Sequence, residues 1–434
     1  MDFNLLLSFS DVASKALPLL IAVLFFGLII LIHEFGHFIF AKIFGVKVNE
    51  FALGMGPTIL KKQGKETKYA LRLFPVGGFV AMEGEEEDSD DKRAYCNQKT
   101  WKRMIILAAG ATFNLILGFI VCIFLVGSEE YVGTNQILQF YDDAVSSEQL
   151  KENDKILEID GKKIFSDYDI SFLMQRNGTG KYDFTVERNG ERVELKDVHF
   201  AKRTSGNFGY DENCAINSVS AKLKKAGLKD GDIIISVNGK DVATGEELIA
   251  AIQSDNDYTF DLKVTREGET INLEQVEFAT ATVFDFIILG EDKNAANVLK
   301  SALGYSFSMG RMVYLSLFDL IRGQYGLNDL AGPIGTISVI TDIAQESVAT
   351  TNWTQLFMIM AMITINIGLF NLLPVPALDG GHLFFMFIEL IIRRPIPQKY
   401  ERWIHAAGLI VLLVFMAVVS ASDLYKWISG VGFY

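Results

Sequence analysis

The sequence predicts a multi-pass α-helical membrane protein with about four transmembrane helices, a membrane-associated β-hairpin or sheet, and two tandem α+β domains. Half of the 434 residues are hydrophobic, and the mean hydropathy of +0.25 is high for a soluble protein. The charged residues gather in regions 41–103 and 128–300 and leave long uncharged stretches elsewhere. That distribution is typical of membrane helices joined to water-soluble domains.

Four apolar segments have the length of a membrane-spanning helix. They cover residues 17–40, 104–126, 355–373 and 405–420. A further apolar stretch at 383–392 follows two prolines, and we interpret it as the third helix continuing past a break. The first segment lacks a basic leader region and a small-residue cleavage site, so we expect a retained helix and not a signal peptide.

The distribution of lysine and arginine residues predicts which side of the membrane each loop occupies. The loops at 41–103 and 393–402 are rich in Lys and Arg near the membrane ends, as cytoplasmic loops are, so the intervening region 128–350 is predicted to lie outside. The predicted divisions are a first transmembrane helix (1–44), a cytoplasmic, membrane-associated β region (45–103), a second helix (104–127), two repeated domains (128–202 and 203–280), amphipathic helices (281–353), a third helix (354–392), and a cytoplasmic loop with the fourth helix (393–434).

The β region alternates apolar and polar residues over 46–82, and glycines interrupt it, among them Gly77 and Gly78. Non-helical backbone this close to membrane helices must be covered by protein or line a water-filled cavity. A small sheet beside the first two helices meets that requirement, and one of its edges could pair with an extended peptide. An ordinary surface hairpin is the alternative.

An internal repeat fills the region between the second and third apolar segments. The pattern at 150–162 recurs at 228–240, and the pattern that begins at Val186 recurs at the same offset of 78 residues. A constant offset across two separated blocks indicates duplicated domains. Each copy is expected to contain a strand, a turn, a second strand, a helix (169–175 and 246–253) and a hairpin.

Residues 226–239 of the second copy resemble the signature of PDZ domains, which bind extended segments by strand addition. The first copy has Asn153 where the second has Gly231, so its signature is degenerate. Modules that act only as spacers or size filters are the alternative. Residues 294–346, which follow the repeats, are interpreted as amphipathic helices interrupted near Pro333.

The strongest chemical signal is His33-Glu34-Phe35-Gly36-His37, inside the first apolar segment. A helix places residues four apart on one face, so His33 and His37 can bind one metal ion together. Glu34 lies beside that face and can act as a general base, which is the chemistry of HExxH zinc hydrolases. These polar residues are costly in a membrane-length segment unless they serve a function.

A catalytic zinc site needs three protein ligands and one open position. Asp379 is the best third candidate, because it follows Pro374 and Pro376 in an apolar setting where prolines and glycines unwind a helix. His382 would share a helical face with Asp379, so it is an alternative candidate for the third ligand. Asn371 is expected either to hydrogen-bond a substrate carbonyl or oxyanion or to pack between helices.

These motifs together resemble the site-2 protease family of intramembrane zinc metalloproteases, peptidase M50. The tandem repeat between the second and third helices is similar to that of the bacterial RseP/RasP branch. In one departure, Ala111 follows Gly110 where family members often have proline. The motifs that carry the resemblance are His33-Glu34-x-x-His37, Asn371 with Pro374 and Pro376, and Leu378-Asp379-Gly380.

The resemblance implies a zinc ion on His33, His37 and Asp379 near the cytoplasmic face, with Glu34 as the general base. It implies regulated intramembrane proteolysis of single-span membrane proteins similar to anti-sigma factors, or of remnant signal peptides. The enzyme would lie in the plasma membrane, with the PDZ-like domains on the outer side. The residues expected to bind substrate are Asn371, Pro374, Pro376, Gly77 and Gly78.

Net charge and cysteine content argue against a nucleic-acid-binding protein and against a disulfide-stabilised fold. A net charge of −13 offers no broad basic surface, so we expect substrates and the lipid bilayer as partners and no nucleic acid. The three cysteines are isolated along the chain, so no disulfide framework is expected. Two other functions stay open: a membrane receptor or scaffold with a structural metal site, and a metal-dependent hydrolase of a non-peptide substrate.

Overall fold

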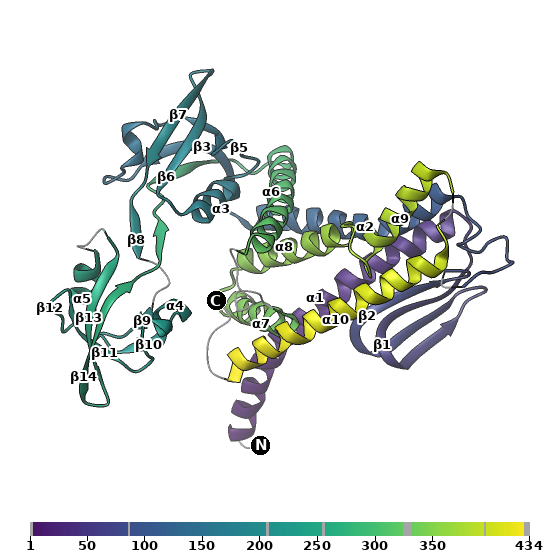
Figure 1. Cartoon of the computed structure of the whole chain (residues 1–434), viewed down its shortest axis with the longest axis horizontal. Helices are drawn as coiled ribbons and strands as arrows, with labels where there is room; N and C mark the ends of the chain where they lie inside the picture. The colour runs from purple at the N-terminus through teal and green to yellow at the C-terminus, as the bar shows by residue number, and fades with distance from the viewer. Residues whose placement is uncertain are drawn as a thin grey trace. The chain divides into compact units, whose positions relative to one another are not determined.

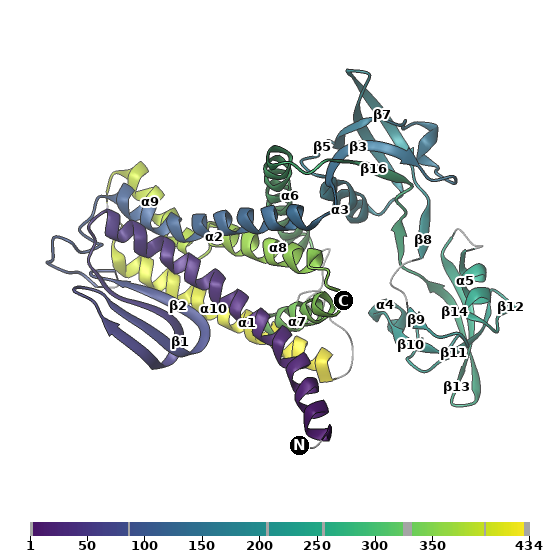
Figure 2. The ribbon, with the colours of Figure 1, turned by 180° about the vertical axis from the view of Figure 1, so that it is seen from behind.

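The computed structural model describes residues 3–85, 87–204, 208–253, 257–323, 332–394 and 396–428. These residues form two units. One unit is mainly helical and combines Met1–Val132 with Asp292–Tyr434 (Figure 1). The other is rich in β-strands and covers Gly133–Glu291 (Figure 2).

Three helices within the described residues are long and apolar enough to cross a membrane. They lie in α1 (Phe3–Ile43), α2 (Thr100–Ser128) and α10 (Gln398–Ile428), at the first, second and fourth predicted spans. The third predicted span corresponds to α8 (Thr354–Phe370), which is apolar but has only 17 residues. The three longer helices confirm a membrane protein, whereas α8 by itself is short for a full crossing.

The third predicted helix is broken by its prolines. α8 ends at Phe370, and α9 (Asp379–Ile392) begins after a segment that contains Pro374 and Pro376. Proline lacks a backbone N–H and clashes with the preceding turn, so the helix cannot continue through this segment. The helices expected after the repeats are α6 (Ala295–Ile321) and α7 (Pro333–Thr350), with Pro333 in the first turn, where proline is tolerated.

Helix α2 occupies the centre of the helical unit, because it packs against α1, α6, α8 and α9. Small residues allow the closest approaches. A Cβ atom on Gly36 of α1 would lie 2.5 Å from the carbonyl oxygen of Ala109 of α2, and one on Gly118 of α2 would overlap Ile365 of α8. Close backbone contact of this kind is how helices associate in an apolar environment.

The β region forms an antiparallel sheet from β1 (Val48–Gln63) and β2 (Lys68–Met82). Both strands bend at glycines with positive φ, so that Phe51 pairs with Tyr69 on one side and Val80 on the other. The sheet packs against α1. The predicted strands at 46–82 are therefore confirmed, and the bends turn two long strands into a folded sheet beside the first helix.

The described residues of the second unit form two larger antiparallel sheets and two short ladders. One large sheet has the order β16-β3-β4-β6-β7, with β5 paired to β4, and the other has the order β12-β11-β13-β14. The elements are β3 (Val132–Phe140), η1 (Ser146–Glu148), β4 (Lys155–Ile159), β5 (Lys162–Lys163), α3 (Asp167–Asn177), β6 (Lys181–Arg188), β7 (Glu191–His199), β8 (Lys202–Thr204), β9 (Phe208–Tyr210), β10 (Ile216–Val219), α4 (Ala221–Lys225), β11 (Ile233–Val237), β12 (Lys240–Asp241), α5 (Gly245–Gln253), β13 (Thr259–Arg266), β14 (Glu269–Glu277), β15 (Thr280–Thr282) and β16 (Phe286–Glu291).

The 78-residue repeat is confirmed at the level of strand register. Lys155 pairs with Glu187 in the first copy, as Ile233 pairs with Thr265 in the second. Each copy also buries one aspartate against an arginine of the hairpin strand: Asp154 with Arg188, and Asp232 with Arg266. Helices α3 and α5 correspond to the two helices predicted at 169–175 and 246–253.

The helices that follow the repeats begin later in the chain than predicted. Amphipathic helices are predicted for 281–353, but this segment begins with the end of β15 (Thr280–Thr282) and continues with β16 (Phe286–Glu291), which joins β3 at the edge of the first large sheet. A short apolar strand cannot be told from a helical segment by its periodicity. Its partner strand also lies far upstream in the sequence, so only the tertiary structure reveals the pairing.

Candidate metal centre

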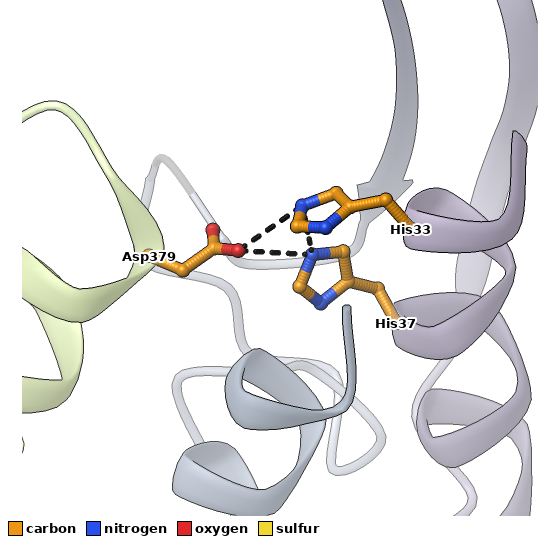
Figure 3. A group of neighbouring side chains, drawn as sticks. All are labelled: His33, His37 and Asp379. Atoms are coloured by element: carbon orange, nitrogen blue, oxygen red, sulfur yellow. Dashed lines mark hydrogen bonds and ion pairs between the residues drawn. The ribbon is translucent and has the colours of Figure 1, made fainter. Parts of the chain in front are cut away.

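His33 and His37 project from one face of α1 into a common space (Figure 3). The two residues are one helical turn apart, so their side chains lie one above the other. The rings meet edge to face with their centroids 4.8 Å apart, and the two Nε2 atoms lie 3.2 Å from each other. This confirms the helical spacing that the sequence predicted for the pair.

Asp379 reaches the same space from the first residue of α9. The broken segment before it is held in shape by its own backbone: Ala377 has a positive φ of 76°, and the Gly380 N–H donates to the Asn371 carbonyl oxygen at 2.8 Å. A Cβ atom on Gly380 would overlap the Leu373 carbonyl, so only glycine fits there. The break therefore turns the carboxylate of Asp379 toward α1.

The three side chains form a triangle of donor atoms that fits a zinc ion. Oδ2 of Asp379 lies 3.2 Å from Nε2 of His33 and 3.3 Å from Nε2 of His37. With metal–ligand bonds of about 2.0–2.1 Å, ligand atoms of a tetrahedral zinc site lie about 3.3 Å apart. The three atoms thus match one face of such a tetrahedron, and the fourth corner is left for water or substrate.

Helix α2 holds both histidine rings from behind. Nδ1 of His37 donates to the carbonyl oxygen of Ile106 at 2.8 Å, which leaves Nε2 free to bind a metal. The amide of the fully buried Asn114 lies 3.4 Å from Nδ1 of His33, and its Oδ1 has no hydrogen-bond donor. Rotating the amide turns Oδ1 toward His33, where it can accept the Nδ1 proton in the same way.

Glu34 lies next to the triangle and against strand β2. Its carboxylate interacts electrostatically with both histidines and Asp379. Gly78 of β2 sits so close that a Cβ atom there would lie 3.0 Å from Cγ of Glu34. The folded sheet therefore borders the side of the centre on which Glu34 lies.

The structure brings some predicted residues together and separates others. Asp379, and not the competing His382, joins the two histidines, because His382 lies with Glu401 and His405 in a second cluster. Gly77 lies against Met55 within the sheet. The remaining residues expected to bind substrate, Asn371, Pro374 and Pro376, lie at the end of α8 and in the segment that leads to Asp379.

Three residues that shape the surroundings were not assigned a role at the sequence level: Gly110, Asn114 and His405. The spacing of Gly110 and Asn114, four residues apart on an apolar helix, is a usable signal because it puts both on one face. Nothing in the local sequence shows that this face meets His33 and His37.

Comparisons with known proteins agree with this geometry. The model of peptidase family M50 matches residues 21–415. A Fusobacterium nucleatum protein that carries a zinc metalloprotease name is 31% identical over 413 residues, covering 94% of this chain and 98% of its own length. The regulator of sigma-W protease RasP of Bacillus subtilis is 27% identical over 447 residues, covering 93% and 97%. The zinc metalloprotease RasP of Oceanobacillus iheyensis is 26% identical over 447 residues, covering 93% and 98%.

Proposed function

The chain belongs to peptidase family M50 and is a zinc-dependent metalloendopeptidase, and we propose that it cuts membrane-spanning proteins within or beside the bilayer. The proposed substrates are single-span membrane proteins similar to anti-sigma factors, and signal peptides that remain in the membrane. A relative named for the regulation of sigma-W supports the first class.

One observation carries this proposal: two of the three donors, His33 and His37, lie on a helix that is long and apolar enough to cross a membrane. Two histidines and two carboxylates in such a setting are expensive unless they serve a function. A peptidase for soluble substrates would gain nothing from this burial. A site inside the apolar helices is useful when the bond to be cut also lies close to the lipid.

The proposed chemistry assigns a role to each residue of the centre. His33, His37 and Asp379 hold the zinc ion. When bound, zinc polarises the scissile carbonyl and lowers the pKa of a water molecule to near neutrality. Glu34 accepts the proton of the attacking water and then delivers it to the leaving amine.

The sheet is proposed to hold the substrate in an extended form. A transmembrane helix resists cleavage because its carbonyl groups are hydrogen-bonded internally. Pairing with an edge of the β1–β2 sheet would replace those hydrogen bonds and present the bond to Glu34, beside Gly78. Exposed large apolar side chains on the sheet, including Met55, Leu60 and Phe74, suit contact with an apolar segment. Asn371 is assigned to hold a substrate carbonyl.

The proposal also includes an orientation in the plasma membrane. The Lys- and Arg-rich loops at 41–103 and 393–402 support a metal centre near the cytoplasmic side of a multi-pass protein. The two repeats are then PDZ-like modules on the outer side. They would admit substrates only after their outer domains have been trimmed, so cleavage here follows an earlier cut.

Glu34→Gln separates catalysis from metal binding. We expect the purified variant to keep one zinc per chain and to cut a single-span reporter substrate at least about 100-fold more slowly than wild type, since the general base is lost. Zinc-loaded wild-type protein that does not cleave a membrane-embedded substrate would contradict the proposal. Wild-type rates in Glu34→Gln would remove Glu34 from its assigned role.

A second pair of variants tests the third ligand. Asp379→Asn is expected to lose zinc, because a carboxylate ligand becomes a neutral amide, whereas His382→Ala keeps all three ligands and is expected to retain zinc in the purified protein, with a lower affinity. Zinc content per chain, measured on detergent-purified protein, distinguishes the two. Full zinc in Asp379→Asn together with loss in His382→Ala would move the ligand role to His382.

A further inference from the structure

One face of α10 contacts the segment that carries Asp379. Glu401, His405 and Gly408 follow at helical spacing, so these three residues lie on the same side of α10. We propose that this α10 face, defined by these three residues, positions the Asp379 carboxylate for metal binding, with His405 as the central positioning residue. The inference rests on the proposed role of Asp379 as a zinc ligand.

His405 holds the backbone immediately before Asp379. The Ala377 N–H donates to Nδ1 of His405 at 3.1 Å. Ala377 has a φ of 76°, a left-handed conformation that is unfavourable for residues other than glycine and that persists only where surrounding contacts enforce it. The hydrogen bond from Ala377 is such a contact, and it acts two residues before the carboxylate.

The same histidine also supports the helix that follows Asp379. Its ring stacks on the ring of His382 in α9, with centroids 3.6 Å apart and planes inclined by 14°. Nδ1 of His382 is hydrogen-bonded to Oε1 of Glu401 at 2.8 Å. His382 lies about one turn beyond Asp379, so α10 holds the chain on both sides of the ligand.

Two glycines make these contacts close. A Cβ atom on Gly381 would lie 2.9 Å from Cε1 of His405 and 2.6 Å from the Val375 carbonyl oxygen. A Cβ atom on Gly408 would overlap Pro376. With no side chain in between, the broken segment rests directly on α10, and a shift of α10 must displace Asp379.

A second metal site is the rival interpretation of this cluster, because His382, Glu401 and His405 lie close enough to hold an ion. The geometry disfavours it. The lone pairs of imidazole nitrogens lie in the ring plane, so two nearly parallel stacked rings do not direct them at one point. Both Nδ1 atoms also have partners already, the Ala377 N–H and the Glu401 carboxylate.

Replacing His405 in two ways tests the proposal. In His405→Asn the side-chain oxygen can occupy the position of Nδ1 and accept the Ala377 N–H, whereas His405→Leu fills similar space without an acceptor. We expect the Leu variant to bind zinc about 10–100-fold more weakly and the Asn variant to stay within about threefold of wild type. Zinc affinity is measured on the full-length protein by competition with a chelator, and the visible spectrum of the cobalt-loaded protein reports ligand geometry.

Controls separate positioning from folding. Ile410→Ala changes an exposed side chain of the same helix and is expected to leave zinc affinity and the cobalt spectrum unchanged. If His405→Leu does not yield folded protein, Glu401→Leu removes the support of His382 and is expected to weaken zinc binding in the same direction.

Three results would overturn the proposal. The first is wild-type zinc affinity and cobalt spectrum in His405→Leu, or in Glu401→Leu if that variant has to replace it. The second is equal loss in the Leu and Asn variants of His405. The third is a second zinc equivalent in wild type that disappears in both, which would make the cluster a metal site. Loss of zinc in Asp379→Asn alongside any of these keeps the proposed function, whereas zinc retained in Asp379→Asn contradicts the assignment of Asp379 as a ligand, on which this inference rests.

Discussion

Gly110 of α2 lies so close to His37 of α1 that a Cβ atom on Gly110 would overlap Nε2 of His37. The same atom would lie 2.9 Å from Cε1 of His33. Both contacts are at the ring edges that face the donor triangle. The space for a metal ion therefore depends on the absence of a side chain on a helix that contributes no ligand.

Gly110→Ala is expected to lose most of its zinc, because the added methyl group displaces the His37 ring from the triangle. The effect on the helix itself is favourable, since alanine exceeds glycine in helix propensity by about 1 kcal/mol. Gly127→Ala is the matched control on the same helix, as nothing lies within 4 Å of that position. Zinc content per chain distinguishes them, and a zinc-replete Gly110→Ala variant would contradict the prediction.

Asn114→Leu is expected to lower zinc affinity by about 10–100-fold, because His33 loses the acceptor that fixes its ring and tautomer. Leucine has similar volume, so packing around this fully buried position is largely kept. The affinity is read from chelator competition. Thr112→Val, at an exposed position of the same helix, should bind zinc as wild type does. Equal affinities for Asn114→Leu and wild type would show that His33 needs no such partner.

Gly78→Val is expected to slow peptide cleavage by about 100-fold while zinc content stays normal, because a displaced general base no longer reaches the attacking water. The new Cβ atom would lie 3.0 Å from both Glu34 and Ile30. Leu71→Val places a β-branched residue at an exposed position of the same strand and serves as the control. Normal cleavage by Gly78→Val would mean that the sheet can move away from Glu34 without consequence.

Glu66, in the turn between β1 and β2, predicts a pH dependence of stability. Hydrogen bonds from Lys42 and Arg93 lower the pKa of Glu66 to about 2. A carboxylate whose pKa is lower in the folded than in the unfolded state stabilises the fold above the unfolded pKa of about 4.3, and this contribution is lost as the pH falls toward 2.

Glu66→Gln is therefore expected to lower stability at pH 7 by about 1 kcal/mol, a modest value because all three side chains are partly exposed. The difference from wild type should shrink between pH 4.5 and pH 2 and vanish below it. Thermal unfolding of the two proteins across this range measures it. A constant difference at all pH values would mean that Glu66 acts through packing and not through its charge.

Much of the fold could be predicted because its signals are local. The long apolar helices follow from hydropathy, the strands at 46–82 from alternation and glycines, and the duplicated domain from a constant sequence offset. The sequence predicts a full span at 355–373, but the apolar helix α8 has 17 residues, which lies at the lower limit for a crossing. β16 was missed, because a short apolar strand has no distinctive period and its partner β3 lies far away in the sequence.

The sequence by itself determined the types of donor atom in the candidate metal centre and the placing of two of its three donors on one helical face. His33 and His37 share a face through helical spacing alone, and the prolines before Asp379 break the helix whatever surrounds them. Only the tertiary structure shows that Asp379, and not His382, lies beside the two histidines, that Gly110 leaves space there, and that Asn114 and His405 contact these segments. These contacts join α1, α2, α9 and α10, and proximity between such distant segments depends on how the helices pack, which no local pattern encodes.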